Sequence, residues 1–290
     1  MKSVISIGNQ DFISIRKNNC FYIDKTDFIR EWWENQDSVT LITRPRRFGK
    51  TLNMSMTEYF FSVNYSDMGQ YFKELSIWKE ERFREIQGTY PVISLSFADI
   101  KATTYESARM SIIRKLVRLY SAFDFIRSSE ALNEKDRIYF DSVGEDMSDD
   151  AAAVGINYMS DYLSRYYGKK VIILLDEYDT PLQEAYVHGY WEELTAFIRS
   201  LFNSTFKTNP YMERGLLTGI TRVSKESIFS DLNNLEVVTT TSEKYSTSFG
   251  FTEEEVFTVL ENAGIPEEKE HVRYWYDGFS FGNRKDIYNP

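Results

Sequence analysis

The sequence is poor in the residues that hold metals and form disulfides. Its 290 residues include one cysteine, Cys20, and two histidines, His188 and His271. A single cysteine excludes a disulfide within the chain, and so few soft ligands exclude a zinc or iron–sulfur site built from cysteine and histidine. The chemistry of this protein therefore has to come from other residue types.

The sequence also lacks long apolar runs and an excess of positive charge. No segment approaches the roughly 18 apolar residues of a membrane-spanning helix, and the N-terminus, MKSVISIGNQDF, lacks the core of a signal peptide. Acidic residues outnumber basic ones 44 to 34, which gives a net charge of −10. Such a surface repels a polyanion, so we expect no direct nucleic-acid binding. Because the sequence has neither a long apolar run nor a signal peptide, we expect a soluble, cytoplasmic protein with no membrane contact.

What is present is a globular composition, with 42% hydrophobic and 16% aromatic residues. The length suits one large α/β domain with an appendage, or two small domains. Apolar runs predict five strands, at 39–43, 91–97, 171–177, 214–220 and 235–240. Because helical patterns alternate with these runs, we predict a doubly wound parallel α/β sheet.

Two regions are expected to lie outside this core. The acidic segment 128–150 is interpreted as a surface excursion. The core is predicted to span 1–245, and 246–290 is predicted to begin a small helical lid or C-terminal subdomain. An aromatic cluster in the second region is interpreted as the interior of that lid, with base stacking as the alternative; its members are Tyr274, Trp275, Tyr276, Phe279 and Phe281.

The segment LITRPRRFGKTLN, residues 41–53, ends like a phosphate-binding loop but does not begin like one. The usual pattern is GxxxxGK(S/T), and Arg44 stands where the first glycine should be. Gly49, Lys50 and Thr51 follow a predicted strand and open a predicted helix, where backbone N–H groups can bind phosphates. Lys50 would then neutralise phosphate charge, and Thr51 would offer its hydroxyl to Mg²⁺.

The loop departs from the usual pattern at two positions. Arg44 replaces a glycine that permits unusual backbone angles, and Pro45 has no N–H to offer a phosphate. Arg46 and Arg47 either add positive potential to the loop or are solvated charges, and the sequence leaves both interpretations open.

A second motif, VIILLDE at 171–177, supplies the acidic residues that such a site needs. A continuous apolar run is typical of a central parallel strand buried on both faces. Asp176 would hold Mg²⁺, and Glu177 would orient and polarise the attacking water. The alternative is a buried strand that ends in solvated acids.

The strand at 214–220 is expected to end beside the same site. Thr218 or Arg222 is then the candidate sensor of hydrolysis. Alternatively, Arg222 pairs with Asp231 or Glu226 at the surface.

Four separated motifs together resemble the AAA-ATPase-like family of bacterial proteins, which is related to archaeal-type and signal-transduction P-loop ATPases. These motifs are FYIDKT, RPRRFGKT, LLDEYDTPL and GITRVSKESIFSDLNNL. The resemblance extends from about Phe12 to the closing YDGFSFGNRKDIYNP. It implies a P-loop fold with sheet order 5-1-4-3-2, and it makes Arg44 the family's own variant of the loop.

Together, the motifs and the family resemblance assign three sets of site residues and two cofactors. The substrate is ATP and the metal is Mg²⁺, held by Thr51 and Asp176. The predicted catalytic residues are Lys50, Glu177 and Arg222. The predicted nucleotide-binding residues are Tyr22, Lys25, Arg46, Arg47, Phe48, Gly49, Lys50, Thr51 and Leu52, with Tyr22 and Lys25 taken from the motif that by resemblance lines the base side of the pocket.

Relatives of this kind often carry a C-terminal domain that resembles restriction-type nucleases. We expect a nuclease-like domain only as a fused or separate partner. The E-x-K strings here, such as 267–269, lie in an acidic, helix-like stretch, so we predict no nuclease activity for these residues. An oligomer is possible but cannot be derived from the sequence.

Two rival functions remain open at this stage. Asp24–Asp27, DKTD, nearly matches the N/T-K-x-D motif of guanine-specific sites, which would require a circularly permuted GTPase. The other rival is a module that binds ATP and passes its conformation to a partner, with slow hydrolysis or none. Glu177 favours an enzyme, because a pure binding module needs no water-polarising carboxylate.

Overall fold

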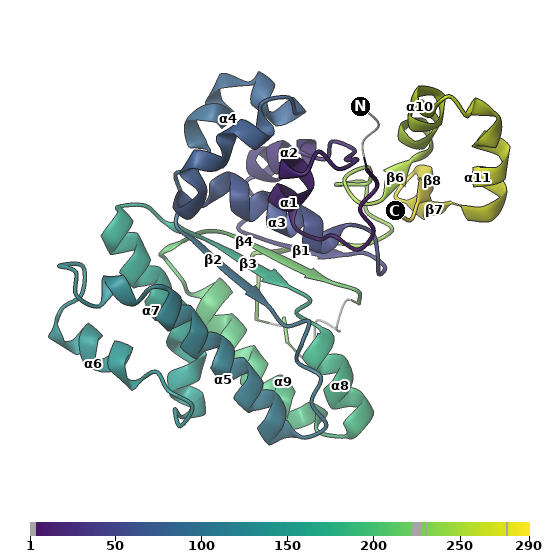
Figure 1. Cartoon of the computed structure of the whole chain (residues 1–290). Helices are drawn as coiled ribbons and strands as arrows, with labels where there is room; N and C mark the ends of the chain where they lie inside the picture. Colours follow the sequence, from purple (N-terminus) through teal and green to yellow (C-terminus); the bar gives the residue numbers. More distant parts are fainter. Residues whose placement is uncertain (1–3, 222–227, 230, 277) are drawn as a thin grey trace.

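A computed structural model of the chain describes residues 4–221, 228–229, 231–276 and 278–290 (Figure 1). Its centre is a five-stranded parallel sheet with the order β2-β3-β4-β1-β5. The strands are β1 (Val39–Thr43), β2 (Val92–Ser96), β3 (Val171–Asp176), β4 (Met212–Gly219) and β5 (Leu235–Val238). The predicted parallel α/β sheet is confirmed, and from its β5 edge the order is 5-1-4-3-2, as the resemblance implies.

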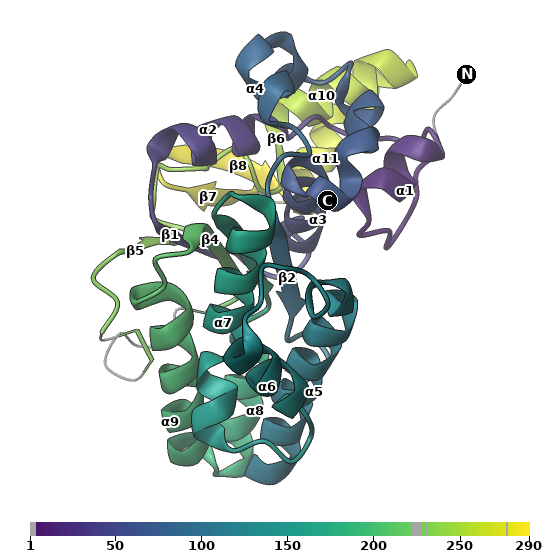
Figure 2. The ribbon, with the colours of Figure 1, turned by 90° about the vertical axis from the view of Figure 1, so that its left-hand side faces the viewer.

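Helices cover both faces of this sheet, as the two views show (Figures 1 and 2). On one face lie α1 (Phe12–Lys17), α2 (Asp27–Asn35), α3 (Lys50–Phe61) and α4 (Glu81–Ile86). On the other lie α5 (Tyr105–Ala122), α6 (Glu134–Ser142), α7 (Asp149–Tyr167), α8 (Thr180–His188) and α9 (Trp191–Phe202). Short 3₁₀ or π segments are η1 (Val63–Phe72), η2 (Ser76–Lys79), η3 (Asp124–Ile126) and η4 (Asn203–Lys207).

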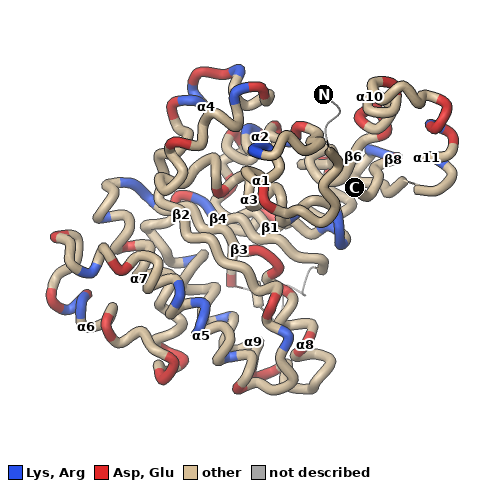
Figure 3. Tube along the Cα trace, in the orientation of Figure 1, with Lys and Arg blue, Asp and Glu red and all other residues tan. Residues whose placement is uncertain are grey.

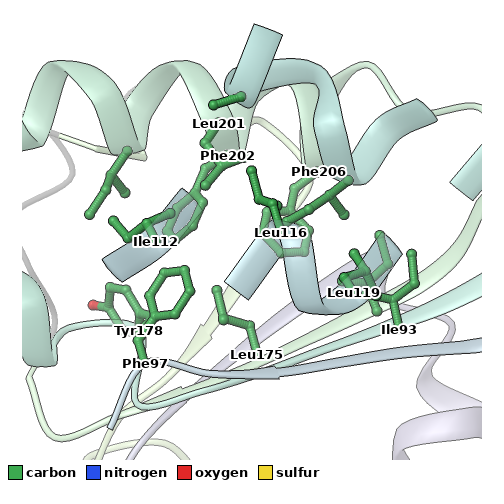
Figure 4. Packing of buried hydrophobic residues seen from close by; sticks show 14 of the residues in the cluster. Ile93, Phe97, Ile112, Leu116, Leu119, Leu175, Tyr178, Leu201, Phe202 and Phe206 are labelled. Atoms are coloured by element: carbon green, nitrogen blue, oxygen red, sulfur yellow. The ribbon is translucent and has the colours of Figure 1, made fainter. Parts of the chain in front are cut away.

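Each face of the sheet has its own hydrophobic core because successive strand side chains point to opposite sides. Toward α5, α7 and α9, strand residues such as Ile93 and Leu175 pack against Ile112, Leu116 and Phe202 (Figure 4). Toward α1–α4, the core also contains side chains from near the C-terminus, namely Phe249, Phe281 and Ile287. The second core therefore joins the N-terminal helices to the end of the chain.

The acidic segment 128–150 contributes more to the fold than the sequence indicated. It contains α6, which begins with a capping box between Asn133 and Asp136. Phe140 and Met147 are buried in the same core as α5 and α7. The charged residues between these apolar positions masked them in the sequence, and the prediction of a mere surface excursion is wrong.

Residues 246–290, predicted to begin a small helical lid or a C-terminal subdomain and called the C-terminal subdomain below, contain strands as well as helices. These elements are β6 (Phe251–Thr252), α10 (Glu253–Ala263), η5 (Pro266–Glu268), α11 (Lys269–Tyr276), β7 (Phe279–Phe281) and β8 (Arg284–Tyr288). The strands form an antiparallel sheet of order β6-β8-β7, which the short runs between turn residues did not reveal. Neither α10 nor α11 has a buried residue.

The aromatic cluster of this subdomain is divided between interior and surface. The Phe281 side chain is fully buried, whereas Tyr274 and Trp275 are 80% and 77% exposed. Phe281 is buried in the core that includes α1–α4, not inside a lid, so the interpretation of the cluster as the interior of a lid is wrong for Phe281 and for the exposed α11 residues.

The distribution of charged residues and of apolar helices in the structure agrees with the composition of the sequence. Figure 3 shows acidic and basic residues interspersed over most elements, while α10 opens with Glu253, Glu254 and Glu255. None of the helices in the described part of the chain has the length and apolarity needed to cross a bilayer.

Candidate functional site

The predicted site residues gather at the carboxyl ends of β1, β3 and β4. Residues 44–49 connect β1 to α3, and Asp176 ends β3. In the register of the sheet, Thr43 lies opposite Gly219 and Leu175 lies opposite Leu217. The parallel arrangement thus brings three separate motifs to one edge, where α/β proteins commonly bind ligands.

The loop turns into α3 through Gly49, which has a φ of 77° and occupies the N-cap. This left-handed conformation favours glycine. Lys50, the first residue of α3, is buried, and its Nζ donates hydrogen bonds to the carbonyl oxygens of Arg44 (3.0 Å) and Pro45 (2.9 Å). The ammonium is therefore held inside the loop that it closes.

The Lys50 ammonium is also electrostatically perturbed. Burial lowers its pKa, and the carboxylates of Asp176, Glu177 and Asp179 act in the opposite direction. Lys50 is therefore a buried cation that donates to backbone carbonyls and lies near the acids at the end of β3.

Thr51 and Asp176, predicted as the metal-binding pair, lie together in the structure. The Thr51 hydroxyl donates to Asp176 Oδ2 at 2.7 Å. Thr218 donates its hydroxyl to the other oxygen, Oδ1, of the same carboxylate. Each oxygen of Asp176 is thereby oriented by a threonine from a different element, and the three side chains form one polar cluster.

Glu177 follows Asp176 in a left-handed conformation, with a φ of 51° that is uncommon for a residue with a side chain. Its Oε2 accepts a hydrogen bond from the Thr180 hydroxyl at 3.1 Å, and its side chain is half-buried. Unusual backbone angles persist where the surrounding structure requires them, and they cluster at functional sites.

Asp179 has a structural role in the turn after β3. It is fully buried, and its Oδ2 accepts hydrogen bonds from Ile220 N (3.0 Å), Thr221 N (2.9 Å), Thr221 Oγ1 (2.8 Å) and Gln183 Nε2 (2.9 Å). Asp179 thus joins the turn that carries Glu177 to the end of β4. No sequence signal distinguished this role from that of an ordinary turn aspartate.

The remaining loop residues face different surroundings. Arg46 and Arg47 are exposed, which is compatible with either interpretation of their charge. Phe48 is buried, with its ring against Phe279 and Phe281, so only its backbone can contribute to binding in the loop. Leu52, on the first turn of α3, is half-buried and packs against the core that includes α1–α4.

Tyr22 and Lys25 have partners on the α3 and α10 side of the loop. The Tyr22 hydroxyl contacts Met56 Sδ at 3.2 Å. Lys25 Nζ donates to both carboxylate oxygens of Glu255 at 2.7 Å and to Thr247 O at 2.8 Å. The sequence offered no signal for the Lys25–Glu255 pair, because its members are 230 positions apart.

The polar groups of the DKTD segment are also engaged within the protein. Asp24 Oδ2 accepts from Ser76 N at 2.7 Å, and Asp27 Oδ1 accepts from the Ser76 hydroxyl at 3.0 Å. Thr26 is buried and bonds to Asp24. These contacts hold η2 against α2. They account for the polar side chains of the segment without assigning them to the binding of guanine.

Two residues of the sensor hypothesis, Arg222 and Glu226, lie outside the described residues. Asp231, the other partner considered for Arg222, accepts a hydrogen bond from Asn203 Nδ2 at 3.1 Å. Thr218, the alternative sensor, lies in the polar cluster with Asp176.

The donor set of the cluster suits magnesium. Mg²⁺ prefers oxygen ligands and is usually held by one or two protein oxygens together with water and substrate phosphates. The Thr51 hydroxyl and the Asp176 carboxylate supply such oxygens side by side, beside the N-terminus of α3.

Together, the parallel sheet, the loop that opens α3 and the acids that end β3 define an α/β protein with a candidate binding site at the carboxyl edge of its strands. The chain belongs to the family described as Predicted AAA-ATPase, which matches residues 6–229. The match includes every predicted site residue and ends before the C-terminal subdomain.

A curated relative is the "Uncharacterized protein in vnfD 5'region" of Azotobacter chroococcum mcd 1. It is 27% identical over 291 residues, which cover 99% of this chain and 50% of the relative. The chain therefore spans about half the length of this relative. No solved structure matches the chain.

Proposed function

We propose that this chain is a Mg²⁺-dependent ATPase of the P-loop class. The observation that carries the proposal is the hydrogen bond from Thr51 to Asp176, which places the predicted metal-binding pair together at the start of α3. Membership in a family of predicted ATPases supports the same activity.

In this proposal, the loop and the first turn of α3 bind the β- and γ-phosphates through backbone N–H groups. Lys50 exchanges its hydrogen bonds to the carbonyls of Arg44 and Pro45 for bonds to phosphate oxygens. Arg46 and Arg47 add positive charge at the entrance of the loop. Tyr22 and Lys25 remain proposals for the base side of the pocket.

Hydrolysis requires a water molecule in line with the bond to the γ-phosphate. Glu177 orients this water and accepts its proton, while the Thr180 hydroxyl fixes the carboxylate. Thr51 and Asp176 hold Mg²⁺, which supplies charge neutralisation at the phosphates. Lys50 stabilises the charge that develops on the transferred group.

The end of β4 is proposed to sense the γ-phosphate. Thr218 contacts Asp176, and Asp179 holds the backbone of Thr221 next to the position of Arg222 in the sequence. We propose Arg222 as a further contact to the transferred phosphoryl group, so that its loss lowers turnover more than affinity.

The biological output is proposed to be a change passed to a partner or a fused domain. The curated relative is about twice as long as this chain, so that protein has room for further domains beside the matched region. A nuclease-like domain is one such partner, and an oligomer is another way to complete the site.

The proposal is tested by calorimetric titration with a non-hydrolysable ATP analogue and its GTP counterpart, with and without Mg²⁺, followed by phosphate release on the same sample. We expect Mg²⁺-dependent binding that favours the ATP analogue, and release of phosphate from ATP. Binding without release would support the switch module instead. Preference for the GTP analogue would support the permuted GTPase, and binding of neither would overturn the proposal.

A further inference from the structure

The residue that replaces the first glycine of the loop, Arg44, is fully buried against the C-terminal subdomain. Its guanidinium carbon lies 4.4 Å from the ring centroid of Phe281 and 5.8 Å from that of Phe249. Its N–H groups donate to the carbonyl oxygens of Thr43 at 3.3 Å and Lys244 at 3.5 Å. The first residue of the loop is thus anchored on β7 and on the segment before β6.

Within the described residues, this guanidinium lacks full compensation. Its Nε has no hydrogen-bond partner there, and no carboxylate of those residues forms an ion pair with it. Burial lowers the pKa of Arg44 to about 10. Cation–π contacts offset part of the cost of burying the charge, but a buried unpaired cation remains unfavourable compared with an apolar side chain.

The rest of the loop contacts the same subdomain. Phe48 packs against Phe279 and Phe281, with ring centroids 4.9 Å and 5.3 Å apart. Gly250 N donates to Phe48 O at 3.2 Å, and a Cβ on Gly250 would lie 2.7 Å from the Phe48 ring. The loop and the C-terminal sheet are therefore in direct contact, and a glycine is required for that approach.

Away from this contact, the helices of the subdomain contribute little burial. Helices α10 and α11 bury no residues and project away from the sheet (Figure 1). Further contacts to the rest of the protein include the hydrogen bond from Asn53 Nδ2 to Ser248 O at 2.8 Å, the bonds from Lys25 to Glu255 and Thr247 O, and the packing of Phe249 on Phe28. Because Arg44 and Phe48 contact Phe281 directly, a change in the loop reaches β7 and, through its pairing, β8.

We propose that Arg44 is a positioning residue that latches the phosphate loop to the C-terminal sheet, and that nucleotide binding tightens this latch. The inference rests on the proposed nucleotide site. Polyphosphate bound in the loop places negative charge close to a buried cation that lacks a carboxylate, which lowers the electrostatic cost of keeping the guanidinium stacked on Phe281. Because coupling between two sites is reciprocal, the latch in turn strengthens nucleotide binding.

The test compares hydrogen exchange in β7 and β8 with and without the Mg²⁺ complex of the non-hydrolysable ATP analogue. We expect slower exchange in the wild-type complex. Arg44→Met keeps the side-chain length but removes the charge, so it should still bind through Lys50, roughly 5- to 50-fold more weakly, and should lose the slowing at β7 and β8. Arg44→Lys, which keeps the charge without the planar stacking group, should restore part of it.

Arg214 provides a matched control at the opposite end of the sheet. It is also buried, stacks on Trp33 with its guanidinium carbon 4.3 Å from the ring centroid, and has an Nε without a partner in the described structure. Arg214→Met removes a buried, stacked guanidinium as Arg44→Met does, but it should leave nucleotide affinity and the slowing of exchange unchanged. An equal effect of both substitutions would reduce Arg44 to a structural role and overturn the proposal.

The outcomes separate the latch from the ATPase proposal. If the wild-type protein binds the analogue but β7 and β8 exchange at the same rate in both states, the latch is wrong and the nucleotide site stands. If the wild-type protein binds no nucleotide, both proposals fail. If Arg44→Met does not fold, Phe281→Leu is used instead, because it removes the aromatic half of the contact. Loss of the slowing of exchange in Phe281→Leu supports the latch. If exchange is still slowed in Phe281→Leu, the latch is overturned.

Discussion

Thr51 and Asp176 are 125 positions apart in the sequence, yet the hydroxyl of the first donates a 2.7 Å hydrogen bond to the carboxylate of the second. Thr218 orients the other carboxylate oxygen. This cluster links the loop after β1 to the ends of β3 and β4. It is the feature on which the proposed magnesium site depends.

Thr51→Val removes the hydroxyl and preserves the shape of the side chain. We expect nucleotide affinity in the presence of Mg²⁺ to fall by roughly 10- to 100-fold, because a metal-orienting oxygen is lost, while affinity without Mg²⁺ changes little. Calorimetric titration in both conditions measures this. Thr57→Val on the same helix removes a buried hydroxyl that bonds to Asn53 O, and it should leave both affinities unchanged.

Glu177→Gln preserves size and hydrogen bonding but removes the base. Phosphate release should fall by about 10²- to 10⁴-fold, the usual contribution of a general base, whereas affinity for the ATP analogue should be retained. The matched control is Glu184→Gln on α8, where the carboxylate pairs with His188. Wild-type turnover in Glu177→Gln would refute the assignment.

The lowered pKa of Lys50 predicts that nucleotide affinity depends on pH. Bound phosphate favours the ammonium, so the pKa of Lys50 is higher in the complex than in the free protein. The contribution of Lys50 is then complete below its pKa in the free protein, which lies under 10.5, and is lost as pH rises through its pKa in the complex.

Titrations between roughly pH 7 and pH 10 should therefore show affinity falling with rising pH and proton uptake on binding. Lys50→Arg keeps its charge over this range and should remove that pH dependence, whatever its affinity. A pH dependence that persists in Lys50→Arg would assign it to another group.

Asp179→Asn tests the link between the turn after β3 and the end of β4. The carboxylate is fully buried and accepts four hydrogen bonds through Oδ2, so loss of its charge should reduce the free energy of unfolding by about 1–3 kcal/mol. Denaturant unfolding measures this change. Asp141→Asn, in an exposed pair with Arg127, should leave the midpoint nearly unchanged.

The local patterns of the sequence were sufficient for much of this structure. Continuous apolar runs such as 171–177 predicted strands buried on both faces, and the four motifs implied the family that the match over residues 6–229 shows. Gly49, Lys50 and Thr51 are consecutive, so the sequence alone places them together. Parallel pairing then brings Asp176 to the same edge as a consequence of the predicted topology.

Other features were not predictable because they depend on residues far apart in the chain. The acidic residues of 128–150 concealed the buried Phe140, and the β6-β8-β7 sheet is built from strands too short to give a clear period. Lys25 meets Glu255 only because α10 lies beside the N-terminal segment.

The sequence by itself determined that an arginine stands in place of the first loop glycine, and that lysine, threonine and two acids occupy the positions predicted for a phosphate site. Only the tertiary structure decided what that arginine does. Side-chain burial depends on what packs against a residue, and here Phe249 and Phe281, more than 200 positions further along the chain, enclose Arg44.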